Sequence, residues 1–352
     1  MKFLHTADLH IGKRVNEFSM LEGQRYILGR IFNIACDVKA DAVLAAGDLY
    51  DRSVPLGEAV SLLDDFITAL SEKGIAVCAV SGNHDSPERL DFGSRIMGAR
   101  GVHIAGTFKG RMEKVTFTDS YGEVYVYLLP FIKPAAAEPF FGAEKTGSYF
   151  DAVSAAVGAS GIDTSKRNVL VAHQFVTSSG EEPLRCDSET VSVGGVDNVD
   201  VSAFSPFDYA ALGHLHGAQS IGRSTVRYSG SPLKYSFSEA HQEKSVTVVE
   251  LGEKGKITLT SVPLVPLHGM REIKGPIGEL TSPAVVSQGD CRDYVRAVLT
   301  DEDEVTDAVG KLRAVYPNIM RIDFENRRTA GGDSQTCAYG DVKNKTPAEL
   351  FG

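Results

Sequence analysis

The sequence is poor in cysteine, and its few cysteines do not come in pairs. They are odd in number, widely spaced and never form a C-x-x-C motif: Cys36, Cys78, Cys186, Cys291 and Cys337. This pattern argues against a disulfide framework and against a structural zinc site built from thiolates. Cys36 and Cys78 stand in apolar runs, where we expect them to be core residues.

Long apolar runs are also missing. The N-terminal stretch MKFLHTADLH has only a short apolar run, unlike a secretory signal, and no apolar span of about 18 residues follows. We therefore predict a soluble protein of the cytoplasm with no membrane partner. The chain has no P-loop motif either, so we do not expect it to bind ATP itself.

Basic residues are fewer than acidic ones. The sequence has 36 Lys and Arg against 46 Asp and Glu, which gives a formal net charge of −10. This acidity argues against a protein that coats nucleic acid non-specifically. It does not exclude DNA binding, because a local basic groove is enough for phosphate contacts. With 352 residues and 43% apolar residues, the chain can bury one large domain and a smaller one.

The first 80 residues alternate between strand and helix patterns. Short apolar runs at 2–5, 42–46 and 75–80 are separated by helical spacing at 21–38 and 57–73. In the second helix we expect the apolar stripe to be Val60, Leu63, Ile67 and Leu70. This β-α-β-α-β order predicts parallel strands in a layered α/β sheet.

The middle of the chain is richer in strand patterns. We predict a hairpin of residues 113–118 and 123–129 around Ser120-Tyr121-Gly122, and a helix at 150–157. Further strands are predicted at 168–172, 209–212, 226–229, 245–251 and 257–262.

The pattern starts again near residue 268. A strand at 293–299, a helix at 302–315 and a strand at 318–324 predict a small separate domain. We place the boundaries at 1–267, 268–330 and 331–352. The last segment is a polar linker followed by TPAELFG, which opens like a capped helix.

Polar clusters follow five of the predicted strands. They are Asp8-Leu9-His10, Asp48 in AGDLYD, Asn83-His84-Asp85, His173, and His214-Leu215-His216. Each lies just past the carboxyl end of its strand, the edge where open α/β sheets bind ligands. Taken singly, each cluster also fits a plain turn, but five in order after strands favour one shared site.

The side chains in these clusters suit divalent metal ions. They offer two carboxylates, one carboxamide oxygen and several imidazoles, with no thiolate. Mixed oxygen and nitrogen ligands suit Mn²⁺, Fe²⁺ or Zn²⁺. The set exceeds what one metal with open positions can use, so it predicts two metals that share a bridging carboxylate and clamp a phosphate.

The same residues carry a family resemblance. DLH, GDLYD, GNHD, the isolated AH and GHLH resemble the five motifs of the calcineurin-like metallophosphoesterases. FLHTADLHIGKR at 3–14, GNHDSPERL at 82–90 and RYSGSPLKYSFSE at 227–239 are similar to the SbcD family of bacterial nuclease subunits. The resemblance implies a layered α/β sandwich of mixed β-sheets flanked by helices, with a small C-terminal α+β capping domain.

The resemblance also implies a ligand set for two Mn²⁺ ions. Asp8, His10 and His216 would hold the first metal. Asn83, His173 and His214 would hold the second. Asp48 would bridge the two ions, and a metal-bound hydroxide would attack the phosphate.

Two further residues receive catalytic roles from the resemblance. His84 would not bind metal but would face the scissile phosphate, stabilising charge or protonating the leaving oxygen. Asp51 would orient His84 through a hydrogen bond, although a solvated turn carboxylate is an equally good interpretation. Asp85 would brace the loop. We expect His5 to be a core or supporting residue, and no ligand role for His103, His241 or His268.

The family activity is that of an Mn²⁺-dependent DNA nuclease. The resemblance implies exonuclease action on duplex ends and endonuclease action on single strands or hairpins, in DNA repair, recombination and replication. It also implies an SbcC-type ATPase partner, bound by a C-terminal segment that would begin near TPAELFG. The basic residues that could contact DNA phosphates are Lys13, Arg14, Arg52, Arg89, Arg95, Arg100, Lys109, Arg111 and Lys114.

A homodimer through the helices at 57–73 and 87–99 is also implied. Spare apolar side chains support it: Leu62 and Phe66 on the first helix, and Leu90, Phe92, Ile96 and Met97 on the second. A covering loop would explain them equally well. Two other functions stay open: a metallophosphoesterase acting on nucleotides or phosphoproteins, and a DNA-end-binding scaffold with a vestigial site.

Overall fold

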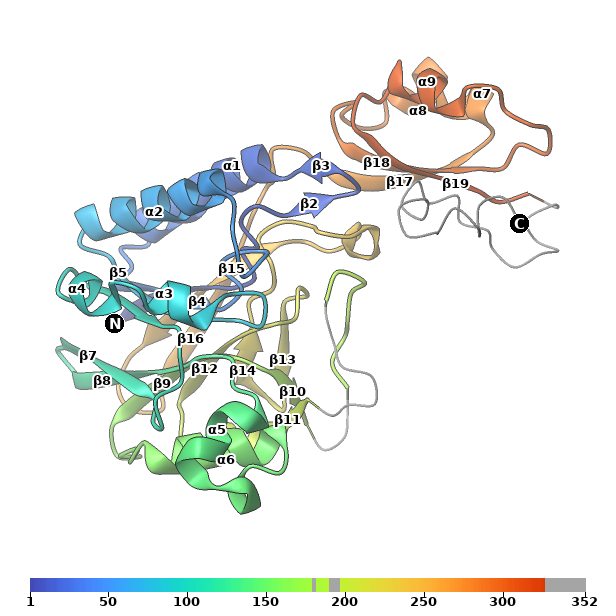
Figure 1. Cartoon of the computed structure of the whole chain (residues 1–352). Coiled ribbons are helices and arrows are strands. Elements are labelled where there is room, and N and C mark those ends of the chain that lie inside the picture. The colour runs from blue at the N-terminus through green and yellow to red at the C-terminus, as the bar shows by residue number, and fades with distance from the viewer. Residues whose placement is uncertain (179–181, 190–196, 327–352) are drawn as a thin grey trace. The chain divides into compact units, whose positions relative to one another are not determined.

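A computed structural model describes residues 1–178, 182–189 and 197–326 (Figure 1). The chain divides into two compact units, residues 1–267 and residues 268–352. The linker and helix start predicted for residues 331–352 lie outside the described residues. No helix within the described ranges is both long and apolar enough to cross a membrane.

The first sheet of the larger unit contains the strands predicted near the N-terminus. β1 (Lys2–Thr6), β4 (Ala42–Ala46), β5 (Ala76–Val80) and β6 (Val102–Ala105) are parallel. β15 (Ser245–Leu251) and β16 (Ile257–Pro263) extend the sheet antiparallel beside β1. Helices α1 (Leu21–Asp37) and α2 (Gly57–Glu72) connect the parallel strands, so the predicted β-α-β-α-β order is confirmed.

The second sheet has the order β13-β14-β12-β9-β8-β7. β8 (Gly122–Leu129), β9 (Arg167–His173), β12 (Tyr209–Gly213) and β14 (Arg223–Tyr228) are parallel. β7 (Glu113–Asp119) forms the predicted hairpin with β8, and β13 (Gln219–Ile221) closes the other edge. α5 (Pro134–Phe141) and α6 (Tyr149–Ala159) pack on its outer face.

The two sheets bury their inner faces against each other. Phe3 and Leu44 of the first sheet share one apolar cluster with Val126, Val171 and Tyr209 of the second. In Figure 1, α1 and α2 lie on one side of the paired sheets, and α5 and α6 lie on the other. The layered sandwich of mixed sheets flanked by helices is therefore confirmed. Among the described residues of the larger unit, four short strands pair outside both sheets: β2 (Arg14–Val15), β3 (Phe18–Ser19), β10 (Phe175–Thr177) and β11 (Asn198–Asp200).

The predicted apolar stripe of α2 is confirmed at Leu63 and Leu70 but wrong at Val60. Leu62 and Phe66, expected on a spare edge, are only 3% and 7% exposed, whereas Val60 is 44% exposed. The buried positions of this helix are Ala59, Leu62, Leu63, Phe66 and Leu70. Their spacing of three and four residues is the periodicity of one helical face, so the register of the prediction was displaced.

The helix predicted at 87–99 is two short helices. α3 (Pro87–Asp91) and α4 (Ser94–Gly98) are separated by Gly93, which has a left-handed φ of 75°. Leu90 is buried, while Phe92 and Ile96 are 87% and 80% exposed. The second helix region therefore does present apolar side chains to solvent.

The smaller unit is a parallel three-stranded sheet with short helices. The strands are β17 (Met270–Gly275), β18 (Tyr294–Leu299) and β19 (Ile319–Phe324), and the helices are α7 (Ile277–Leu280), α8 (Pro283–Val286) and α9 (Ala308–Arg313). Strand β17 was not predicted from the sequence. The last helix was predicted at 302–315, but α9 begins only after Asp307, whose carboxylate caps the Gly310 N–H at 3.0 Å.

Candidate metal centre

The polar clusters meet at one edge of the larger unit, where the parallel strands of both sheets end. Asp8 and His10 follow β1, and Asp48 follows β4. The two sheets are joined there by direct contacts. His173 Nδ1 lies 2.8 Å from the Ala46 carbonyl oxygen, and the His214 N–H donates to Asp8 Oδ1 at 2.9 Å.

The backbone at this edge adopts unusual conformations. Asp8, His10 and Asp48 have left-handed φ values of 53°, 43° and 50°, and His214 has a φ of 106°. Such conformations are rare for residues with a side chain, and they cluster where a site constrains the chain. The sharp turns let each side chain leave its strand and point across the sheet edge.

Three donor residues form a first cluster: Asp8, His10 and His216. One ligand atom of each lies within 4.8 Å of the others. The Nε2 atoms of His10 and His216 face each other at 3.1 Å. The Oδ2 atom of Asp8 is buried and has no hydrogen-bond partner.

Three other residues form a second cluster: Asn83, His173 and His214. Asn83 Oδ1 lies 3.0 Å from His173 Nε2 and 2.9 Å from His214 Nδ1. His214 Nε2 is buried without a hydrogen-bond partner. The ring of Phe131 stacks over His214 at 6.4 Å between centroids, which keeps one side of this cluster apolar.

Asp48 lies between the two clusters. Its Oδ2 is 3.7 Å from His10 Nε2 of the first cluster and 3.4 Å from His173 Nε2 of the second. Its Oδ1 accepts the His84 N–H at 2.9 Å. Neighbouring glycines make room for it, because a Cβ at Gly82 would lie 2.1 Å from Asp48 Oδ1.

The side-chain oxygen and nitrogen atoms of the two clusters are suited to bind cations. His173 Nδ1 donates to a carbonyl, so in a neutral ring Nε2 is an acceptor, and it faces Asn83 Oδ1, which is also an acceptor. Two facing acceptors require either a proton or a cation between them. In the first cluster, the buried Asp8 Oδ2 has no hydrogen-bond partner, so it too requires a proton or a cation beside it. His and Asp clusters able to hold metal are thus present.

Burial and charge together set the protonation of these groups. Burial would lower the pKa of His173, but the Asp48 carboxylate raises it to about 9. Burial raises the pKa of Asp8 to about 7. Burial alone would raise the pKa of Asp48. The nearby charge of His173 outweighs this effect and holds the pKa of Asp48 well below its usual range. Burial lowers the pKa of His214 to about 3 and that of His10 well below its usual value.

His84 lies beside both clusters, and its expected partner needs a correction. Its Nδ1 lies 3.0 Å from the main-chain carbonyl oxygen of Asp51, not from the carboxylate. The Asp51 carboxylate instead accepts Lys13 Nζ at 2.8 Å, and its Oδ1 is 3.6 Å from His10 Nδ1. The His84 ring meets the His10 ring edge-on at 4.8 Å. A His84 ring nitrogen also comes within 4.8 Å of donors of His10 and Asp48.

Asp85 and His5 support the site from behind. The Asp85 carboxylate accepts the main-chain N–H groups of Leu49, Tyr50 and Gly82 at 2.9–3.1 Å, so it braces two of the loops, as expected. Burial raises its pKa to about 6. His5 is fully buried, with Nδ1 2.8 Å from the Tyr209 hydroxyl.

Sequence reasoning missed the residues that hold His216. Its Nδ1 lies 2.7 Å from the Ser188 hydroxyl, and its N–H donates to Glu189 Oε1 at 2.7 Å. Ser188 in turn donates to Glu239, which is fully buried. The signal was the RYSGSPLKYSFSE stretch, which ends at Glu239 and which carried only the family resemblance at the level of sequence.

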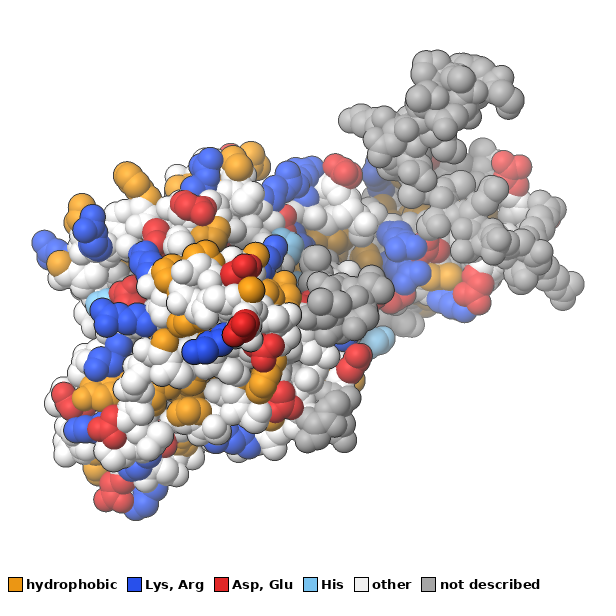
Figure 2. All heavy atoms as spheres, turned by 60° about the horizontal axis from the view of Figure 1, so that its bottom comes forward, with side chains coloured by type: hydrophobic (Ala, Val, Ile, Leu, Met, Phe, Trp, Pro, Cys, Tyr) orange, Lys and Arg blue, Asp and Glu red, His pale blue; other side chains and the backbone are white. Residues whose placement is uncertain are grey.

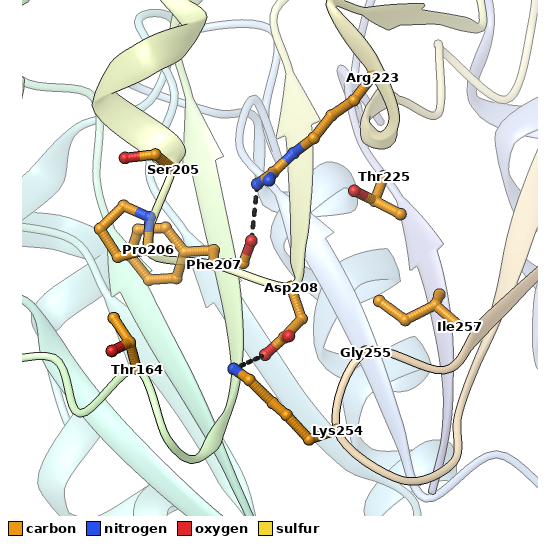
Figure 3. A pocket seen from close by; sticks show the side chains of 10 residues that line it. All are labelled: Thr164, Ser205, Pro206, Phe207, Asp208, Arg223, Thr225, Lys254, Gly255 and Ile257. Atoms are coloured by element: carbon orange, nitrogen blue, oxygen red, sulfur yellow. Dashed lines mark hydrogen bonds and ion pairs between the residues drawn. The ribbon is translucent and has the colours of Figure 1, made fainter.

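A separate cavity of about 400 Å³ lies at the opposite edge of the second sheet (Figure 3). Thr164 and Asp208 in its wall precede β9 and β12, whereas the clusters follow these strands. Its charged groups are already paired. Lys254 Nζ lies 2.8 Å from Asp208 Oδ2, and Arg223 donates to the Phe207 carbonyl at 2.6 Å. The cavity is therefore not part of the candidate site.

Two families match the chain. The calcineurin-like phosphoesterase family matches residues 1–218, which include every residue of both clusters. The family described as type 5 capsule protein repressor C-terminal domain matches residues 266–352.

Relatives of high coverage agree with the first match. The D subunit of the nuclease SbcCD from Staphylococcus epidermidis is 33% identical over 366 residues, covering 99% of this chain and 95% of that protein. The protein of the same name from Staphylococcus saprophyticus is also 33% identical, covering 92% of this chain and 84% of that protein. A solved dimetal phosphatase from Danio rerio is 12% identical with a TM-score of 0.42, covering 75% of this chain and 96% of that one. The chain belongs to the calcineurin-like phosphoesterases and, within them, to the SbcD family of nuclease subunits, and it is a hydrolase of the metallophosphoesterase class.

Proposed function

We propose that this chain is the nuclease subunit of an SbcCD complex, a two-metal phosphodiesterase that cleaves DNA. The observation that carries the proposal is the close approach of metal-ligating atoms in both clusters. Asn83 Oδ1 faces two imidazole nitrogens at 2.9–3.0 Å, and His10 Nε2 faces His216 Nε2 at 3.1 Å. Two neighbouring groups of converging donors with a carboxylate between them suit a pair of ions that clamp a phosphate.

Each cluster would hold one divalent ion, with Asp48 shared between them. The oxygen and nitrogen donor set suits Mn²⁺, which is the ion we propose. When bound, such ions neutralise the phosphate and lower the pKa of a water molecule so that it can act as the nucleophile. The protein supplies the fixed geometry: the buried rings of His173 and His10 cannot leave the sheet edge.

His84 would act on the phosphate. Its Nδ1 donates to the Asp51 carbonyl, so Nε2 is the nitrogen left for substrate. The ring is only partly buried, unlike those of His10 and His173. A proton held at Nε2 would stabilise negative charge on the phosphate and pass to the leaving oxygen.

DNA would be bound through its backbone. Arg52 lies beside the site, where its Nε is 3.7 Å from the Asp51 carboxylate, and its side chain is 65% exposed. Lys13 pairs with the same carboxylate at 2.8 Å and is only 14% exposed, so it is a weaker candidate than Arg52. Lys109 is 64% exposed but pairs with Asp91 at 2.8 Å. Lys and Arg side chains are interspersed with Asp and Glu on the face of the larger unit in Figure 2. The sequence carries no base-reading motif, so we propose recognition of DNA backbone and end geometry rather than of sequence.

Two protein partners follow from the family. The relatives are named as one subunit of SbcCD, so we propose an SbcC-type ATPase as partner. We also propose a homodimer through α2 and the α3–α4 region. The apolar side chains for it are Val60, Phe92 and Ile96, because Leu62 and Phe66 belong to the core. Size-exclusion chromatography tests the proposed homodimer. The double variant Phe92→Glu, Ile96→Glu should elute as a monomer, and the unaltered protein as a dimer.

The test compares substrates in Mn²⁺. Purified protein would receive linear duplex DNA, hairpin DNA, a small phosphodiester, a nucleotide and a phosphopeptide. We expect cleavage of duplex ends (exonuclease) and of hairpins or single strands (endonuclease), which would suit DNA repair and recombination. Cleavage of the nucleotide or phosphopeptide alone would instead favour another metallophosphoesterase activity. DNA binding with no hydrolysis in any arm would favour a scaffold.

A further inference from the structure

The ring of His216 is held on the side away from the clusters by a buried acid. Its Nδ1 lies 2.7 Å from Ser188 Oγ, which lies 2.6 Å from Glu239 Oε1. Ser188 therefore links the ring to Glu239, whose side chain has no exposed surface. No other described histidine of the two clusters is held through a hydroxyl in this way. His173 uses a main-chain carbonyl for the same nitrogen.

Both oxygens of Glu239 are acceptors. Oε2 lies 2.5 Å from the buried Lys244 Nζ, and Oε1 accepts the main-chain N–H of Tyr235 at 3.1 Å. Ser236 Oγ also donates to Oε1, at 3.0 Å. An ammonium group at one oxygen and several donors at the other leave no position for a carboxyl proton.

These contacts decide where the proton of His216 lies. Ser188 has one hydroxyl hydrogen, and Glu239 Oε1 can only accept, so Ser188 donates to Glu239. The Ser188 oxygen must then accept from His216, so Nδ1 carries the ring hydrogen. In the neutral ring Nε2 keeps its lone pair, and this is the atom that faces His10 Nε2.

The loop that carries Ser188 is fixed at several points. Glu189 Oε1 accepts the His216 N–H at 2.7 Å, and its Oε2 accepts the Cys186 N–H at 3.0 Å. The Asp187 N–H donates to Ser238 Oγ at 3.0 Å, next to Glu239. The contacts bind both the ring and the main chain of His216, so the loop and the family-specific stretch form one support.

We propose that Ser188 and Glu239 are positioning residues of the metal centre. They hold the hydrogen of His216 on Nδ1 and thereby aim the lone pair of Nε2 into the first cluster. Partners of this kind, behind a metal ligand, fix its tautomer and orientation. The proposal rests on the proposed function in one respect, that His216 binds metal. It also gives the RYSGSPLKYSFSE stretch a role, because this stretch delivers Glu239 to the support.

Binding of Mn²⁺ to the full chain tests the support directly. Ser188→Ala removes the hydroxyl, and we expect Mn²⁺ at the first cluster to bind about 10–100-fold more weakly, with the second cluster unchanged. Ser188→Thr keeps a hydroxyl and should restore binding. Ser165→Ala is the control for loss of a serine hydroxyl, because Ser165 bonds Asp163 and touches neither His216 nor Glu239. It should bind as the unaltered protein does, in calorimetry and in Mn²⁺ electron paramagnetic resonance.

The tautomer can be read without metal. In ¹⁵N-labelled, metal-free protein, long-range ¹H–¹⁵N spectra recorded at alkaline pH, where the ring is neutral, should show the proton of His216 on Nδ1, and a mixture of tautomers in Ser188→Ala. A neutral His216 ring with its proton on Nε2 in the unaltered protein would overturn the proposal, and so would unchanged Mn²⁺ binding by Ser188→Ala. If the unaltered protein bound no Mn²⁺ at all, the metal centre itself would be wrong. The spectrum would still report on the support.

Discussion

The two clusters of the candidate metal centre each offer one side-chain oxygen and two imidazoles, but they are built differently. In the second cluster, His173 ends a central strand and is fixed by the Ala46 carbonyl of the opposite sheet at 2.8 Å. In the first, His216 lies beyond a strand and is fixed by Ser188, on a loop, and by a buried charged pair. His173 is therefore held by main chain, and His216 by side chains.

This difference has consequences for how each cluster can fail. No side-chain substitution can remove the carbonyl that holds His173, so this contact is lost only when the backbone moves. The support of His216 can be removed one atom at a time. We therefore expect substitutions that weaken metal binding at the second cluster to destabilise the fold as well. At the first cluster, single substitutions should weaken metal binding step by step.

The largest expected effect comes from the residue that both clusters share. Asp48→Asn replaces the carboxylate that lies 3.7 Å from His10 and 3.4 Å from His173. Loss of this charge should weaken both ions and reduce DNA cleavage in Mn²⁺ by about 1,000-fold or more. Mn²⁺ stoichiometry and cleavage rate are the measurements. If one ion remained at full affinity, Asp48 would belong to a single cluster.

His84→Gln should separate chemistry from metal binding. Glutamine cannot supply the imidazole proton, so cleavage should fall by about 100-fold or more, while both clusters keep their ions. Asp51→Asn is the comparison, because the main-chain carbonyl of residue 51 still accepts a hydrogen bond from His84 Nδ1. We expect this variant to lose less cleavage activity than His84→Gln does. Anomalous scattering that showed a missing ion in His84→Gln would instead make His84 a ligand.

The second cluster can be broken through Gly47. This glycine has a φ of 88°, and a Cβ there would lie 2.3 Å from His173 Nδ1. Gly47→Ala should lower the free energy of unfolding by about 3 kcal/mol and displace His173, with loss of the second ion. Gly74→Ala is the matched control: its φ is 72°, but nothing lies within 4 Å of the added atom. It should cost only about 1 kcal/mol and leave Mn²⁺ binding intact. Denaturant unfolding and Mn²⁺ titration measure both effects.

The contrast between the clusters also explains what could be predicted from the sequence. Strand-end positions such as Asp8, Asp48 and His173 were found because apolar runs mark strands, and parallel strands end at one edge. The layered sheets followed from the same runs. Boundaries of the first helices were correct to about a residue because their spacing is regular.

Features that depend on long-range contacts were out of reach. Ser188 and Glu239 are far apart in the sequence. Ser188 stands in no motif, and the stretch that ends at Glu239 does not reveal its contact, so only the folded chain brings the two residues to His216. The partner of His84 is a main-chain atom, which no residue type reveals. The stripe of α2 was misjudged because Val60 and Leu62 are both apolar and only packing distinguishes them.

The smallest expected effect is a pH dependence that differs between the clusters. The pKa of His173 is raised above its usual 6.5 to about 9, so without metal this ring holds a proton at neutral pH that an ion must displace. That proton stabilises the metal-free fold fully below about pH 6.5, and the stabilisation is lost as the pH rises through 9. Mn²⁺ affinity at the second cluster should therefore rise about tenfold per pH unit from pH 7 to 9. In the first cluster Asp8 has a pKa of about 7, so it loses its proton at lower pH than His173 does. Mn²⁺ affinity at the first cluster should therefore stop rising at a lower pH. Calorimetry in two buffers of different ionisation enthalpy would count the protons released by each ion. Equal release from both clusters at pH 8 would contradict the difference.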